Sequence, residues 1–197
     1  MTIELDETGE KIVKATFDII KREGIAKATT KKISAEAGFN EVTIFRKFEN
    51  KNNLIDITKE YYTQMLISKL EDAFDFTGDE KVEEYLQNNF IGLLSLSDDD
   101  FGIIKVGMEE AGEASDRKRL LSQITEAILD KFEAYFTLQI EKGAIREVDP
   151  RVLGVLCYSM TFQSIVLYRI YNDADDIEKE EYGKNYLDIL FNGIKKQ

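Results

Sequence analysis

The sequence predicts an all-α protein, and three observations support this fold class. Apolar residues recur about every 3.6 positions along most of the chain, which is the spacing of amphipathic helices. Only one proline and 12 glycines occur in 197 residues, although sheets and long loops normally need more of both at their turns. Hydrophobic residues make up 43% of the chain and charged residues 32%, so the chain can bury a core of its own.

The first two predicted helices lie near the N-terminus. An apolar stripe predicts a helix over residues 8–23, which ends at Gly24. A two-turn helix follows over residues 30–37, because a threonine offers an N-cap in front of it and Gly38 suits the left-handed residue behind it. The stripe of the first helix comprises Ile12, Val13, Ala15, Thr16, Ile19 and Ile20.

The third predicted helix begins after the N-cap candidate Asn40 and covers residues 41–48. Asn50 offers another cap, in front of a long amphipathic helix over residues 51–75. The buried side of the third helix is expected to comprise Ile44, Phe45 and Phe48.

Five further helices complete the chain, and the breaks between them carry turn or cap signals. Gly78 lies in the first break and Gly143 in a later one, while Asp149 and Pro150 supply an N-cap followed by a proline at the first helical position. These helices are expected over residues 80–96, 99–111, 115–142, 150–168 and 177–195, which gives about nine helices in total.

The helix that begins at Pro150 carries no charge between Val152 and Tyr168. About 17 to 25 apolar residues can span a bilayer, but polar residues dilute this stretch, so we expect no membrane span. A helix that is apolar on all sides needs cover on all sides. We expect the core to cover one face and a second copy of the chain to cover the other, with the last two helices forming a homodimer interface.

The two short helices predict a helix-turn-helix, whose second helix enters the DNA major groove. Gly38 takes the turn between them, and Ile33, Phe39 and Ile44 form the small core on which both helices rest. The small residues Ser34 and Ala37 lie where the helices approach each other. A short helix pair of this kind is a weak signal alone, because helical hairpins without DNA are common.

The charge is distributed unevenly along the chain, whose net charge is −12. Residues 21–51 hold eight basic and four acidic residues, a net charge of +4, whereas residues 51–197 hold 17 basic and 29 acidic ones, a net charge of −12. A basic segment attached to an acidic body is expected of a chain that binds a polyanion at one end. The alternative is an ordinary solvated helical surface.

The segment from Thr30 to Leu54 resembles the DNA-binding domain of the TetR family of bacterial transcriptional repressors, the tetracycline-repressor-like regulators. The family pattern is a threonine, Ile-Ala, Ala-Gly-Val-Ser, Thr-Leu-Tyr, a phenylalanine, and a lysine followed three residues on by leucine. The resemblance is specific over residues 8–60 and architectural beyond them. The positions that match are Thr30, Ile33, Ala37, Gly38, Thr43, Phe48, Lys51 and Leu54.

The resemblance implies a DNA-binding domain over residues 1–50 and a ligand-binding and dimerisation domain over residues 51–197. It implies a ligand-responsive repressor that binds a palindromic operator as a homodimer and is released by a small-molecule effector. Base edges or flanking phosphates are expected to contact Asn40, Glu41, Val42, Thr43, Arg46 and Lys47, and phosphates to contact Thr30, Lys31 and Lys51. Phe45 completes the set of candidate DNA-contacting residues.

Two positions depart from the family pattern. Phe45 replaces a tyrosine whose hydroxyl usually contacts a phosphate, so that this contact is missing or is supplied by Arg46. Val42 replaces a glycine, and it either contacts a thymine methyl group or crowds the groove. Glu41 either accepts a hydrogen bond from a cytosine amino group or caps its helix.

An effector pocket in the larger domain is expected to combine apolar bulk with a few hydrogen-bonding groups. The alternative for each of these residues is an ordinary place in the core, which is the usual role of aromatic stripes at helical spacing. The candidate pocket residues are Met108, Tyr135, Phe136, Tyr158, Phe162, Gln163 and Tyr168.

The composition excludes several classes of enzyme. The chain has no histidine, which removes His-based general acid–base chemistry, His-activated nucleophiles and His-bearing metal sites. Cys157 is the only cysteine and is expected to be a buried structural thiol in a reducing cytoplasm. We therefore expect a cytoplasmic non-enzyme without metal or cofactor. The open alternative is a helical ligand-binding or adaptor protein that has lost sequence-specific DNA binding.

Overall fold

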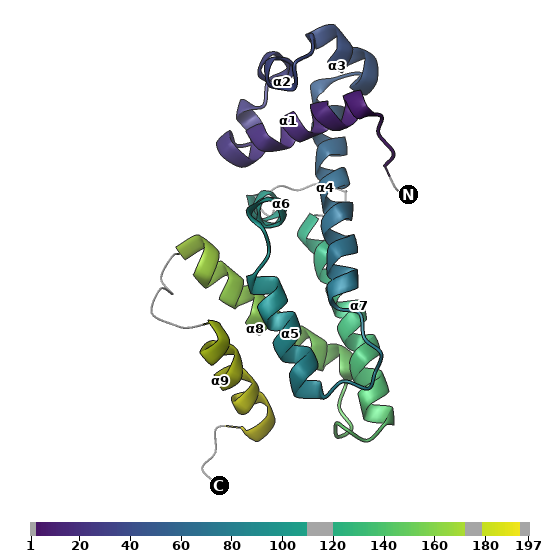
Figure 1. The fold of residues 1–197 in the computed structure, drawn as a ribbon, viewed down its shortest axis with the longest axis vertical. Coiled ribbons are helices and arrows are strands. Elements are labelled where there is room, and N and C mark those ends of the chain that lie inside the picture. The colour runs from purple at the N-terminus through teal and green to yellow at the C-terminus, as the bar shows by residue number, and fades with distance from the viewer. Residues whose placement is uncertain (1–2, 110–119, 172–178, 194–197) are drawn as a thin grey trace. The chain divides into compact units, whose positions relative to one another are not determined.

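The protein is all-α in a computed structural model that describes residues 3–109, 120–171 and 179–193 (Figure 1). This fold class and the expected number of helices are confirmed for the described part of the chain. The helices are α1 (Glu7–Glu23), α2 (Thr30–Ala37), α3 (Glu41–Phe48), α4 (Lys51–Ala73), α5 (Val82–Leu94), α6 (Asp98–Glu109), α7 (Leu120–Glu141), α8 (Pro150–Val166) and α9 (Lys179–Asn192).

The predicted capping residues occupy the predicted places. Asn40 accepts a hydrogen bond from the backbone N–H of Thr43 at 2.9 Å, and Asp149 accepts one from Val152 at 2.9 Å. Gly38 lies in the left-handed region at φ 75° and ψ 27°, where a side chain would be strained. These caps explain why α3 and α8 begin at the expected residues.

Two short elements were not expected from the sequence. A 3-10 turn, Ile25–Lys27, follows α1, and a turn of π-helix, Leu167–Tyr171, follows α8. Other boundaries differ from the expected ones by a few residues, as for α5, which begins at Val82 and not at residue 80. The expected helix ends at residues 111 and 195 and helix starts at residues 115 and 177 lie outside the described residues.

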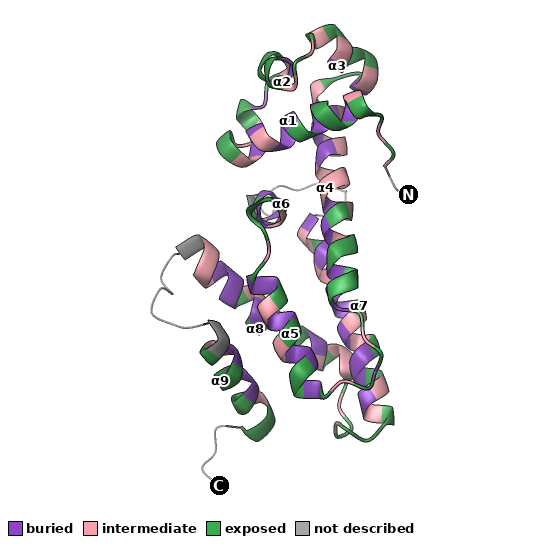
Figure 2. Cartoon of the chain, in the orientation of Figure 1, coloured by how far each residue is buried: buried purple, intermediate pink, exposed green. Residues whose placement is uncertain are grey.

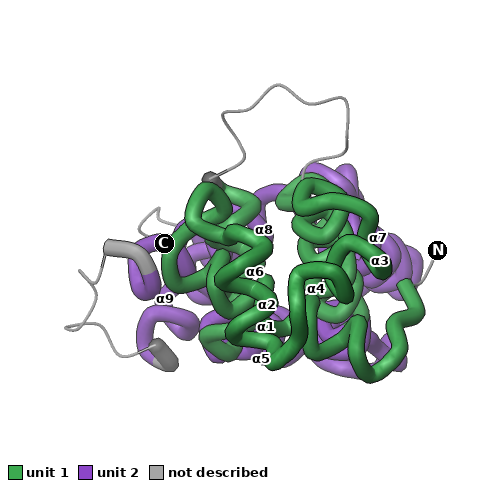
Figure 3. The backbone as a smooth tube through the Cα atoms, turned by 90° about the horizontal axis from the view of Figure 1, so that it is seen from above, with its two compact units in different colours: residues 1–68, 97–124 green, residues 69–96, 125–197 purple. Residues whose placement is uncertain are grey.

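The chain divides into two compact units, coloured separately in Figure 3. Residues 1–68 and 97–124 form unit 1, and residues 69–96 and 125–197 form unit 2. The core of unit 1 joins residues from every helix that contributes to the unit. Its buried members include Ile12, Val13, Ile19, Ile20, Ala28, Ile33, Ile44, Phe48, Leu54, Ile55, Val106 and Leu120.

The core of unit 2 is aromatic. Tyr85 of α5 stacks on Tyr135 of α7 with ring centroids 3.7 Å apart, and Phe132 stacks on Phe136 at 5.6 Å. Gly154 of α8 packs against this layer so closely that a Cβ atom there would lie 3.1 Å from Cβ of Phe132. The burial pattern in Figure 2 follows this arrangement, with buried residues on the inner faces of α5 and α7.

The outer faces of α8 and α9 expose large apolar side chains. One helix among the described residues, Pro150–Arg169, is long and apolar enough to cross a membrane by length and composition, and a third of its 18-residue apolar window is buried. A single helix of this kind is weak support for a membrane span, because core helices of soluble proteins pass the same test. The exposed apolar residues are Val152, Val155, Leu156 and Met160 on α8 and Ile189 and Phe191 on α9.

Candidate nucleic-acid interface

α2 and α3 form a compact helix-turn-helix within unit 1. Ile33 and Ile44 are completely buried, and Phe39 packs against them from the turn. The N–H of Phe39 donates to the backbone carbonyl of Ser34 at 2.9 Å, which closes the end of α2. The small core and the closed turn hold α3 in a fixed orientation against α2.

The outward face of α3 carries apolar side chains as well as polar ones. Val42 is 72% exposed and Phe45 is 47% exposed, while Ile44 and Phe48 are buried. The expectation that Phe45 lies on the buried side of α3 is therefore wrong. Phe45 follows Ile44 in an eight-residue helix, and the helical turn places it towards solvent.

Several of the predicted DNA-contacting residues bond to each other. The Thr30 hydroxyl donates to the carboxylate of Glu41 at 2.6 Å, which ties the start of α2 to the start of α3. Asn40 accepts from the Thr43 hydroxyl at 3.1 Å in addition to the capping bond. Glu41 is therefore already a hydrogen-bond acceptor inside the protein.

Lys47 is held by Asp6, the residue that caps α1. The Asp6 carboxylate lies 2.5 Å from the Lys47 ammonium group, whose side chain is only 22% exposed. The hydrogen bond from Lys47 lowers the pKa of Asp6. Lys47 is therefore the most engaged of the predicted basic contacts.

Ion pairs between α1 and α2 engage part of the basic segment. Arg22 pairs with Glu36 at 3.0 Å, and Lys32 pairs with Glu23 at 2.6 Å. These hydrogen bonds lower the pKa values of both glutamates, so the carboxylates stay ionised. Two of the eight cations of residues 21–51 are thus paired with carboxylates of the same segment, and the net charge of +4 already includes these carboxylates.

Three predicted DNA-contacting cations remain without a recorded ion pair among the described residues. Lys31 is exposed on α2, Arg46 is exposed on α3, and Lys51 is half-buried at the start of α4. The side chain of Asn50 caps α4 there, accepting from the N–H of Asn53 at 2.9 Å. Lys51 therefore stands beside an ordered helix N-terminus.

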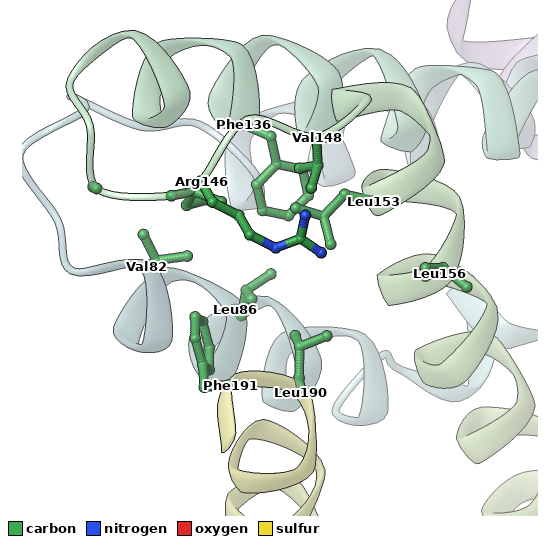
Figure 4. A pocket seen from close by; sticks show the side chains of 11 residues that line it. Val82, Leu86, Phe136, Arg146, Val148, Leu153, Leu156, Leu190 and Phe191 are labelled. Carbon is green, nitrogen blue, oxygen red and sulfur yellow. The ribbon is translucent and has the colours of Figure 1, made fainter. Parts of the chain in front are cut away.

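The predicted pocket residues are divided between the two units. Met108 belongs to unit 1, whereas the other six belong to unit 2. Tyr135 and Phe136 are completely buried, Tyr158 bonds to the Thr125 hydroxyl at 3.1 Å, and Gln163 is exposed. Of the seven, Phe136 alone lines the pocket of unit 2 shown in Figure 4. Sequence reasoning missed the other residues of that pocket.

The thiol of Cys157 is buried in α8, and burial raises its pKa to about 11. A protonated, buried thiol is a poor nucleophile at neutral pH. Among the described residues, no group of three or more acidic or cysteine side chains could hold a metal ion.

Comparison with protein families gives one match. Residues 12–56 match the family of bacterial regulatory proteins of the tetR type. The match covers most of α1, all of α2 and α3, and the start of α4, which is the segment that carries the resemblance seen in the sequence. No curated protein matches the chain.

Comparison with solved structures extends the similarity to the whole chain. GusR of Salmonella enterica aligns at TM-score 0.74 and 17% identity, over 96% of this chain and 100% of that one. PfmR, a TetR-family regulator of Thermus thermophilus, aligns at TM-score 0.67 and 17% identity, over 94% and 99%. FadR of Bacillus subtilis, solved in complex with stearoyl-CoA, aligns at TM-score 0.67 and 20% identity, over 94% and 99%. The chain has the fold of the TetR-family transcriptional regulators.

Proposed function

We propose, starting from the TetR-family DNA-binding segment, that the chain is a ligand-responsive transcriptional repressor that binds a palindromic operator as a homodimer. The observation that carries the proposal is the solvent-facing side of α3, which presents Val42 and Arg46 beside a closed helix-turn-helix core. In this proposal residues 1–50 bind DNA and residues 51–197 bind the effector and form the dimer.

Base contacts are assigned to the start of α3, since a recognition helix enters the major groove by its N-terminal end. The exposed Val42 suits the methyl group of a thymine, and Thr43 suits a base edge. Asn40 and Glu41 hold the helix start through their hydrogen bonds, and we assign them a positioning role that leaves room for a base contact.

Phosphate contacts are assigned to cations that have no recorded partner in the described part of unit 1. Lys31, Arg46 and Lys51 can each neutralise a phosphate without breaking an ion pair. The N–H groups at the start of α2 add neutral donors. The Thr30 hydroxyl contributes only when it exchanges Glu41 for a phosphate. Lys47 contributes only when it exchanges Asp6 for a phosphate, and Phe45 offers apolar contact without a hydroxyl.

The dimer interface is assigned to α8 and α9. Their exposed apolar side chains need cover, and a second copy of the chain supplies it with the same surface in a two-fold arrangement. A two-fold dimer reads two equal half-sites, which gives a palindromic operator. We place this regulator in the cytoplasm.

The effector is assigned to the larger domain. Met108, Tyr158, Phe162 and Tyr168 are partly accessible in the described structure and stay candidates for its contacts, as does the exposed Gln163. The other two candidates are fully buried in unit 2. These are Tyr135 and Phe136.

The test is fluorescence anisotropy with the intergenic DNA upstream of the protein's own gene, at two salt concentrations, with random duplex as competitor. We expect binding that resists the competitor and weakens steeply with salt. A selection from random duplexes serves as the second arm, because the operator need not lie upstream of the gene. Failure to enrich any sequence there would overturn the proposal.

The second candidate is a helical adaptor that has lost DNA binding. It is favoured by the Asp6–Lys47 ion pair on α3 and by the net charge of −12. It predicts no salt-dependent binding to any duplex in the same experiment, so the two candidates give opposite results.

A further inference from the structure

Unit 2 contains a pocket of about 380 Å³ whose lining includes one of the predicted effector residues, Phe136. The pocket is open to solvent, and its lining comes from the start of α5, the end of α7, the α7–α8 connection, α8 and the end of α9 (Figure 4). Its volume falls within the range of about 300–1,000 Å³ that is usual for small-molecule sites. The wall is apolar, with Val82, Leu86, Phe136, Leu153, Leu190 and Phe191 among its residues.

Arg146 carries the only polar side chain among the described residues that line this pocket. Figure 4 shows its guanidinium group lying between Leu153 on one side and Leu86 and Leu190 on the other. The chain before it is anchored, because the N–H of Ala144 donates to the carbonyl of Gln139 at 2.9 Å. The α7–α8 connection, which carries Arg146 into the lining of the pocket, is therefore hydrogen-bonded to the end of α7.

Arg146 has no recorded carboxylate partner among the described residues, and the next arginine in the chain shows the contrast. Arg151 bonds to three carboxylates of α7, those of Glu126, Asp130 and Glu133, at 2.8, 2.7 and 3.1 Å. These acidic side chains of α7 are thus engaged by Arg151. The guanidinium of Arg146 retains its full set of donors for a ligand.

We infer that this pocket binds an amphipathic monocarboxylate, a single carboxylate carrying a hydrocarbon body of moderate size. The carboxylate accepts two parallel hydrogen bonds from the Arg146 guanidinium, the geometry that arginine favours. The hydrocarbon body covers the apolar wall and removes it from water. A neutral ligand cannot form an ion pair with Arg146 and should bind more weakly. A cationic ligand is repelled by the positive charge of Arg146.

This pocket shares only Phe136 with the residues assigned to the effector above, so the inference goes beyond the proposed function. Binding itself does not depend on DNA, so it can be measured separately. Leu156 and Phe191, which are 55% and 41% exposed, belong both to the pocket and to the apolar faces of α8 and α9. The competing occupant is therefore a second copy of the chain, seated on the same residues.

The experiment is isothermal titration calorimetry of the full chain with decanoate, decanol and decylammonium, each below its aggregation concentration. We expect decanoate to bind about tenfold more tightly than decanol, because the charged hydrogen bonds are lost with the alcohol, and decylammonium not to bind. Arg146→Gln should lower the affinity for decanoate to the affinity that the wild type has for decanol. Lys184→Gln makes the same charge change on α9 away from the pocket and should leave decanoate binding within about twofold.

A filling substitution tests the location independently of charge. Leu153→Trp places bulk in the pocket and should abolish the binding of decanoate and decanol alike, with circular dichroism confirming that the variant is folded. Three results would each overturn the proposed carboxylate site. These are equal affinity for decanoate and decanol, unchanged decanoate affinity in Arg146→Gln, and no binding of decanoate to the folded wild type. Decanoate binding that vanishes as dimers form, followed by sedimentation, would assign the pocket to the second copy instead. Intact decanoate binding without specific DNA binding would count against the proposed function alone.

Discussion

The carboxylate of Asp6 contacts both the N–H of Gly9 at 2.8 Å and the ammonium group of Lys47 at 2.5 Å. One side chain thus caps α1 and holds a cation of α3. The first contact stabilises the start of α1, whereas the second competes with any phosphate that Lys47 could bind. A substitution that removes the charge of Asp6 but keeps its hydrogen bond to Gly9 separates the capping of α1 from the ion pair with Lys47.

Asp6→Asn is expected to tighten DNA binding, because asparagine still caps α1 but no longer holds Lys47 as an ion pair. Lys47 then gains a phosphate, so the dependence of log K on log salt should steepen by about one unit. Anisotropy at four salt concentrations measures this slope. Asp18→Asn, which removes the same charge from the Lys14 pair on α1, is the control and should leave the slope unchanged.

Lys51→Ala is expected to weaken binding to all duplexes almost equally and to lower the salt slope by about one unit, since Lys51 is assigned to a phosphate. Thr43→Ala is expected to change the sequence preference with little effect on the slope. Binding to a panel of half-site variants distinguishes the two results. Equal effects of both substitutions on every duplex would contradict this division of roles.

Ile44→Ala and Val42→Ala should differ sharply in stability although they lie on the same short helix. Ile44 is completely buried in the core of unit 1, so its truncation should lower the free energy of unfolding by about 2–5 kcal/mol. Val42 is mostly exposed, and its truncation should change that free energy by less than about 0.5 kcal/mol. Urea unfolding measures both, and similar losses would mean that Val42 is packed.

Glu80 should stabilise unit 2 only while it is ionised. Hydrogen bonds from the backbone N–H and hydroxyl of Thr77 and the N–H of Gly78 lower the pKa of Glu80 to about 2 from its ordinary 4.5. Its contribution is therefore complete above pH 4.5 and is lost as the pH falls towards 2. Glu80→Gln should melt at a lower temperature than the wild type at pH 7, and the difference should shrink steadily below pH 4.5. A difference that is constant with pH would refute the ionic role.

Cys157 should be inert towards thiol reagents in the folded protein. Burial raises the pKa of the Cys157 thiol to about 11. The thiolate is the form that reacts with thiol reagents, and here it is both scarce at neutral pH and buried. Relative to an ordinary thiol, the thiolate fraction at pH 8 falls by about a hundredfold from the pKa alone. Stopped-flow labelling with and without denaturant measures the ratio, and fast labelling of the native protein would show that α8 opens readily.

Local signals carried most of the correct sequence predictions. Asn40, Asp149 and Gly38 act within three or four residues of themselves, so their side chains and backbone preferences reveal helix ends without knowledge of the fold. The buried face of α3 was harder to predict, because Ile44 and Phe45 are both apolar and only packing decides which one is buried.

Contacts between distant residues could not be predicted from the sequence. Asp6 and Lys47 are 41 residues apart, and no periodic pattern links them. Arg146 lies in a connection between helices, where hydrophobic spacing carries no information, so its place in the pocket depended on how the surrounding helices converge. The same holds for the ion pairs that neutralise part of the basic segment.

Unit 1 is assembled from two separate stretches of chain, and this affects how the protein is made and how it can be recombined. Val106 and Leu120 complete a core that begins with Ile12, so a nascent chain on the ribosome cannot close this core until residue 120 has emerged. By then residues 69–96 of unit 2 have already been synthesised. In a chimera that takes only residues 1–50 from a related protein, Leu54, Val106 and Leu120 would pack against core residues of that other protein. Residues 1–68 and 97–124 should therefore be exchanged together.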